Sequence, residues 1–134
     1  MAALSTWAIR LALVQLLAAF LAGGWLLAAR GIPSLPRPDW LLPVHLELAL
    51  LGWTLQLAMG VAYWMLPKFK SGPPRGPTGP AIAALVVFNA GVLLVLASSV
   101  SGVAGLALVG RTGELAGVGL FAANALPRIK AFGR

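Results

Sequence analysis

The chain contains no cysteine, one histidine and three acidic residues among its 134 residues. The absence of cysteine excludes disulfides, iron–sulfur clusters, thiolate-bound haem and covalent c-type haem attachment. Charged residues make up only 10% of the chain and hydrophobic residues 60%, whereas a soluble domain carries about 25% charged residues. This composition is typical of an integral membrane protein.

The net charge of +7 would suggest a nucleic-acid partner in a soluble protein. Here, however, the basic residues are mostly between the apolar runs and at the C-terminal end, where they set membrane topology. We therefore expect contact with a lipid bilayer and no nucleic acid.

Four apolar stretches predict an all-α, integral membrane four-helix bundle in one domain, with spans at roughly 9–29, 40–66, 80–101 and 103–126. The first run is too long for a signal peptide, so we expect a retained helix in which Gly23-Gly24 allows close contact with another helix. No long polar break separates the last two spans, but one helix of about 46 residues would be roughly twice a membrane thickness. A turn at Gly102–Gly105 is therefore expected.

Lysine and arginine are distributed unequally between the two ends of such a bundle. One end receives the N-terminus, the loop containing Lys68 and Lys70, and the C-terminus with Arg134. The other end receives Arg30 and Arg37. By the positive-inside rule, both termini should be cytoplasmic in the inner membrane, with the second span starting at the outer face.

The second span contains the candidate site, because it holds His45. A histidine within a span is costly to place and marks a functional site by default. At 100° per residue, the helix face that carries His45 also carries Gly52, Gln56, Met59 and Tyr63. Gly52 lies about 10 Å from His45 along the axis, comparable with the width of a porphyrin. A missing side chain there would admit a flat macrocycle whose iron is bound by His45.

A structural role explains the same residues without a cofactor. A lone intramembrane histidine can hydrogen-bond a neighbouring helix, and Gly52 and Gly60 can be helix-packing contacts. Zinc is disfavoured as the metal, because one histidine and few carboxylates form a poor ligand set. At this stage both a haem ligand and a structural histidine remain open.

The second span also carries a family resemblance. The string His45-Leu46-x-x-x-x-Leu51-Gly52-Trp53, followed by Gly60-x-x-Tyr63-x-x-x-Pro67, resembles the second-helix motif of the haem–copper oxidase superfamily, closest to nitric oxide reductase large subunits. Further resemblance to small, stand-alone relatives lies in Asn89-x-Gly91, Leu115-Ala116 and Leu120-Phe121-x-x-Asn124-x-x-Pro127-Arg128. In the family, this histidine binds the low-spin haem. The resemblance therefore implies haem b, with His45 as the metal ligand.

Departures from the family limit the expected activity. The large subunit contains several four-helix arcs, and this chain has one. Pro43 stands where a second histidine often occurs, and the histidines that ligate copper are absent. We therefore expect electron transfer, with a redox partner protein, or gas or haem sensing, and not a terminal oxidase or nitric oxide reductase. The alternative is a haem-free accessory or assembly subunit of a respiratory membrane complex.

One histidine per chain leaves the sixth iron position open. The resemblance favours a homo-oligomer, a trimer more than a dimer, whereas a haem shared between two His45 side chains requires a twofold axis. Arg111 either pairs with Glu114, three residues along the same helix, or Arg111, Arg30 or Arg37 binds haem propionates. We favour the second role for Arg111, because an arginine inside a span needs a partner.

Overall fold

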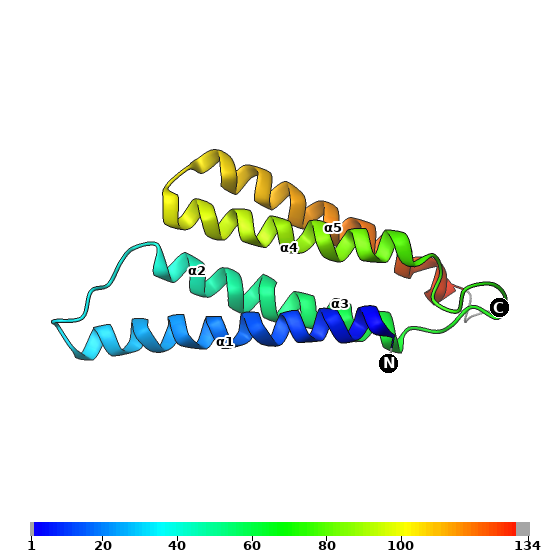
Figure 1. The fold of residues 1–134 in the computed structure, drawn as a ribbon, viewed down its shortest axis with the longest axis horizontal. Coiled ribbons are helices and arrows are strands. Elements are labelled where there is room, and N and C mark those ends of the chain that lie inside the picture. Colours follow the sequence, from blue (N-terminus) through cyan, green and yellow to red (C-terminus); the bar gives the residue numbers. More distant parts are fainter. Residues whose placement is uncertain (1, 131–134) are drawn as a thin grey trace.

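The structure is a computed structural model that describes residues 2–130, and within them it is helical without strands. Four rods form the bundle shown in Figure 1. They are α1 (Ala3–Gly31), a second rod built from α2 (Leu41–Glu47), η1 (Leu48–Leu55) and α3 (Gln56–Met65), then α4 (Thr78–Ser101) and α5 (Ala104–Lys130). Each rod is long and apolar enough to cross a membrane. The predicted all-α four-helix bundle is confirmed.

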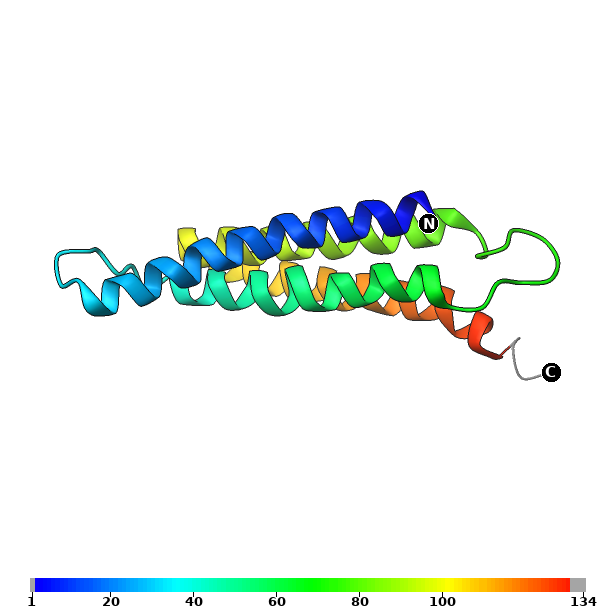
Figure 2. The same cartoon turned by 90° about the horizontal axis from the view of Figure 1, so that it is seen from below.

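The rods pack as two antiparallel pairs, one formed by α1 and the second rod, the other by α4 and α5. Ala2, the connection at residues 66–77 and the end of α5 lie at one end of the bundle (Figures 1 and 2). The connection at residues 32–40 and the turn after α4 lie at the other end. This arrangement brings the elements that carry most of the basic residues to the same end.

Two helices are longer than the sequence predicts. α1 begins at Ala3, before the expected start near residue 9, and α5 continues through Pro127 to Lys130, beyond the expected end near residue 126. Proline removes one backbone donor, and near a helix end the freed carbonyl can reach water or headgroups. The turn between the last two spans falls at Gly102, whose φ of 74° suits the left-handed residue that ends α4.

The second rod is interrupted by a π-helical segment, η1, which runs from Leu48 to Leu55. Within it the hydroxyl of Thr54 donates to the carbonyl of Ala49, five residues earlier, at 2.9 Å. π-helical turns are rare and frequently occur at functional sites. Because the π-helical turn is wider, an angle of 100° per residue does not apply through η1. The contacts of the side chains therefore show which of them share a helix face.

Glycines bring the backbones of α4 and α5 into direct contact. A Cβ atom added to Gly91 would lie 2.6 Å from the backbone nitrogen of Glu114, and one added to Gly117 would lie 2.7 Å from the backbone nitrogen of Phe88. Small residues spaced like Gly113 and Gly117 allow this approach between membrane helices, whose association depends on packing. α4 and α5 therefore form a helical hairpin whose two backbones touch at glycines.

Gly117→Leu should destabilise this hairpin by about 1–3 kcal/mol, because the backbone of Phe88 cannot move aside as a side-chain tip can. Gly119→Leu is the matched control, since a Cβ atom there meets nothing within 4 Å. Unfolding of the purified protein in detergent measures both. Equal unfolding midpoints for the two variants would show that the contact of Gly117 with Phe88 does not stabilise the hairpin.

Candidate functional site

His45 lies at the contact between α2 and α1, and its side chain is half-buried. Its Nδ1 atom is 2.8 Å from the carbonyl oxygen of Ala19. A carbonyl oxygen only accepts hydrogen bonds, so in the neutral imidazole Nδ1 carries the hydrogen and Nε2 keeps its lone pair. Within residues 2–130, no hydrogen bond to Nε2 is formed. The ring is thus held through Nδ1.

Gly23 of α1 provides the room for this ring. A Cβ atom added to Gly23 would lie 2.7 Å from Cε1 of His45 and 3.0 Å from Nδ1. The neighbouring Gly24 has nothing within 4 Å. Of the two glycines for which helix contact is predicted, Gly23 makes it and Gly24 does not.

Gly52 also faces α1, where the side chain of Gln15 fills the place beside it. A Cβ atom at Gly52 would overlap Oε1 of Gln15 and lie 2.8 Å from its Cδ. Gly60 similarly packs against Ala8, whose Cβ would lie 3.0 Å from a Cβ atom added to Gly60. A porphyrin edge against Gly52, as the sequence predicts, would require Gln15 to move. Both glycines make the helix-packing contacts of the alternative interpretation.

Gln56 is fully buried and belongs to a hydrogen-bonded cluster that joins three helices. Its Nε2 donates to the carbonyl of Ala8 at 3.1 Å, and its Oε1 accepts from Nε2 of Gln15 at 3.3 Å. The same Gln15 nitrogen donates to Oδ1 of Asn89 in α4 at 2.9 Å. Gln56 therefore links the second rod to α1 and, through Gln15, to α4.

Met59 and Tyr63 are buried and line a cavity of about 20 Å³. Ser5 lines the same cavity, and its buried hydroxyl has no hydrogen-bond partner. A cavity of this size has room for about one water molecule. The space beside Met59 and Tyr63 suits a buried water that bonds Ser5 and is too small for a macrocycle.

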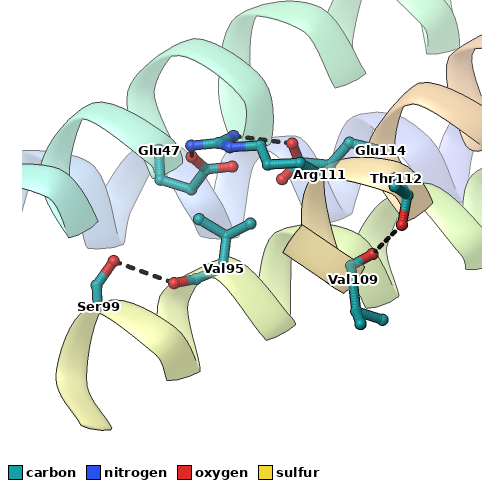
Figure 3. Close-up of polar contacts among 7 residues, drawn as sticks. All are labelled: Glu47, Val95, Ser99, Val109, Arg111, Thr112 and Glu114. Atoms are coloured by element: carbon teal, nitrogen blue, oxygen red, sulfur yellow. Dashed lines mark hydrogen bonds and ion pairs between the residues drawn. The ribbon is translucent and has the colours of Figure 1, made fainter. Parts of the chain in front are cut away.

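Arg111 of α5 bonds two carboxylates at once (Figure 3). Its Nη2 lies 2.7 Å from Oε2 of Glu47 and its Nη1 lies 2.8 Å from Oε2 of Glu114. Both glutamates are buried, and the Oε1 atom of each has no partner. The pairing of Arg111 with Glu114 is thus present, and Glu47 is a second partner. With both carboxylates on its guanidinium, Arg111 is less suited to propionates than the sequence suggests.

Arg128 is a structural residue whose role the sequence does not reveal. It is 1% exposed, and its Nη2 donates to the carbonyls of Tyr63 at 3.0 Å and Leu66 at 2.6 Å, while Nε donates to Pro67 at 3.0 Å. Its guanidinium carbon also lies 5.4 Å from the centre of the Tyr63 ring. The last carbonyls of a helix need partners and carry partial negative charge. Arg128 therefore caps the end of α3, a role that its place in the resemblance string does not predict.

The chain matches no protein-family model, no curated protein and no solved structure. The resemblance to the haem–copper oxidase superfamily stays a prediction that depends on the second-span string.

The six predicted site residues separate into three groups. His45 donates from Nδ1 to Ala19, and no hydrogen bond to its Nε2 is formed within residues 2–130. Gly52, Gln56, Met59 and Tyr63 are buried inside the bundle. Arg111 belongs to an ion-pair cluster. An imidazole nitrogen is a donor that haem iron accepts, whereas the space beside Gly52 is filled by Gln15.

Arg111→Met should destabilise the protein by about 3 kcal/mol, because it leaves two buried carboxylates without a counter-charge. Unfolding in detergent at neutral pH measures the loss. Replacing all three residues of the cluster with apolar ones (Arg111→Met, Glu47→Leu and Glu114→Leu) should recover most of it, because no buried charge then remains. A single variant as stable as the wild type, or a triple variant less stable than the single one, would contradict this account of the cluster.

Proposed function

We propose that the chain is a membrane-embedded b-type haem protein whose iron is held by His45. Its role is electron transfer to or from a partner protein, or sensing of a gas or of haem, without a copper centre. The haem supplies one-electron redox chemistry and an iron position that can take a diatomic gas.

The hydrogen bond from Nδ1 of His45 to Ala19 carries this proposal. Histidines that bind metals usually donate their other ring hydrogen to a carbonyl or carboxylate, which fixes the tautomer, orients the ring and raises the basicity of the ligating nitrogen. Gly23 adds the room that keeps the ring in this orientation. These contacts support a preorganised ligand in the outer half of the bundle.

The place of His45 favours one histidine for each haem. Its ring lies against α1 of its own chain, whereas a haem shared across a twofold axis would need two such rings to face each other at a chain interface. Coordination by His45 alone leaves an iron position for a gas. It is also compatible with the homotrimer that the family resemblance suggests.

We further propose that both termini are cytoplasmic in the inner membrane. The end of the bundle that contains Ala2 and the connection with Lys68, Lys70 and Arg75 carries the greater number of basic residues. By the positive-inside rule, His45 then lies toward the outer face, where a redox partner in the outer compartment can approach.

His45→Ala should abolish haem binding, because no other imidazole and no thiolate exists in the chain to replace the ligand. Wild-type protein purified from haem-supplemented cells should show a Soret band and about one haem per chain. When reduced, it should bind carbon monoxide, as a five-coordinate iron does. His45→Gly with added imidazole should regain the band and separates lost ligation from misfolding.

Two results would contradict this proposal. A haem retained by His45→Ala would show that another group binds the iron. A colourless wild-type protein that also fails to bind added hemin would favour the haem-free accessory or assembly subunit.

Reporter fusions test the orientation separately. A phosphatase that is active only outside the cytoplasm should be inactive when fused after Arg134, which lies outside the described residues, and active when inserted at Ser34. An active fusion after Arg134 would reverse the topology and move His45 toward the cytoplasmic side.

A further inference from the structure

A groove with two charged residues in its lining lies between the second rod and α5. It has a volume of about 280 Å³, which is room for several water molecules or a small polar headgroup. Glu47 of α2 and Arg111 of α5 both line it. The rest of the lining is apolar and comes from the second rod: Pro43, Leu46, Leu50 and Leu51. The groove therefore combines an apolar surface with one charge of each sign.

Glu47 brings to this groove an acceptor that no group of the described residues satisfies. The residue is 4% exposed, and its Oε2 accepts from Nη2 of Arg111, whereas its Oε1 has no partner. A buried carboxylate oxygen without a hydrogen bond is costly, so the site favours a ligand that donates one. With both glutamates ionised, two carboxylates share one guanidinium, and the cluster keeps one net negative charge. A cationic donor would answer both needs.

Arg111 brings donors for an anion to the same groove. Its side chain is half-exposed, and it uses two N–H groups to bond Glu47 and Glu114 (Figure 3). Its remaining N–H groups form no hydrogen bond within residues 2–130. Guanidinium N–H groups bind phosphate oxygens well. The lining thus suits a zwitterion, with the cation at Glu47 and a phosphate at Arg111.

The two charged side chains lie within reach of lipid headgroups. Glu47 is six residues after the start of α2 and Arg111 is seven after the start of α5, a depth of about 10 Å. Both helices begin at the same end of the bundle (Figure 1). Helical side chains lean toward the N-terminus of their helix, so both lean toward that end, and an arginine near a helix end reaches the interface. Leu46 and Leu50 are exposed beside them, where acyl chains can lie.

We propose that this groove binds phosphatidylethanolamine from the surrounding bilayer. The ammonium group donates to Oε1 of Glu47, the phosphate accepts from Arg111, and the acyl chains lie along Leu46 and Leu50. Ethanolamine suits the groove better than choline, because a fully methylated nitrogen has no N–H for the unpaired oxygen. A headgroup without a cation suits it less, because the cluster is already negative. The bound lipid joins the second rod to α5.

Native mass spectrometry of the full-length protein in detergent tests this proposal. Phosphatidylethanolamine and phosphatidylcholine with identical acyl chains are added in equal amounts, and the lipid retained by the protein is counted. The wild type should retain phosphatidylethanolamine about fivefold better, because only this headgroup makes the charge-assisted hydrogen bond. Equal retention of the two lipids would overturn the proposal. The readout is the mass of the lipid, so the result does not depend on whether haem binds.

Two variants that remove the same charge locate the contact. Glu47→Gln should abolish the preference, because it replaces the carboxylate that lines the groove and leaves the pair of Arg111 with Glu114 intact. Glu114→Gln is the matched control and should keep the preference, since Glu114 does not line the groove. Helical circular dichroism confirms that each variant is folded. Equal loss in both variants would show that the charge of the cluster, and not contact with Glu47, selects the lipid.

Methylated headgroups test the hydrogen bond itself. The N,N-dimethylethanolamine lipid keeps one N–H and should be retained like phosphatidylethanolamine, whereas the choline lipid has none. A dimethyl lipid that is retained as weakly as the choline lipid would overturn the bond to Oε1 of Glu47. A wild-type protein that prefers phosphatidylglycerol to all of these would show that Arg111 alone recruits lipid, which would also overturn the proposal.

Discussion

Polar side chains within this bundle must bond one another or the backbone, because lipid tails offer no hydrogen-bond partner. Three clusters provide such bonds along the length of the described structure. Arg128 bonds the carbonyls at the end of α3, Gln15 joins Gln56 to Asn89 in the middle, and Arg111 bonds two buried glutamates farther along. The Arg128 and Arg111 clusters both join α5 to the second rod, and the Gln15 cluster joins α1 to the second rod and α4, so together they specify which helix faces meet.

Glycines opposite these polar side chains make the clusters possible. Gly23 gives room to His45 and Gly52 gives room to Gln15, while glycines of α4 and α5 let their backbones touch. In lipid, where burying apolar surface drives little association, close packing and polar bonds have to hold helices together. The same arrangement fixes the orientation of the His45 ring through Ala19 and Gly23.

The sequence predicts the fold well, because hydrophobic runs and proline-rich connections are local signals. Gly102 marks the turn between α4 and α5, and the composition of each span predicts its helix. Contacts between helices depend on the rotation of each rod about its own axis, which has no local signal. This explains why Gly52 is predicted as open space, although Gln15 of a different helix fills it.

The sequence likewise does not show which polar side chains bond each other across helices. The spacing of Arg111 and Glu114 predicts their pair, but Glu47 joins them from a distant segment. The π-helical η1 has no composition that distinguishes it from α-helix, yet it lies between His45 and Gln56 and changes how their faces relate. A search for small residues at regular spacing would have indicated the α4–α5 contact through Gly113 and Gly117. No comparable signal marks Arg128 as a helix cap.

The central claim is that the only histidine binds haem iron, and its single occurrence permits a direct test. Protein labelled with ¹⁵N only at histidine, in the ferric state, can be measured by pulsed electron paramagnetic resonance. If His45 binds the iron, we expect a strong ¹⁵N coupling from one directly bound nitrogen, Nε2, with a weak coupling from the remote Nδ1. A haem signal without any ¹⁵N coupling would show that His45 does not bind the iron and would contradict the account.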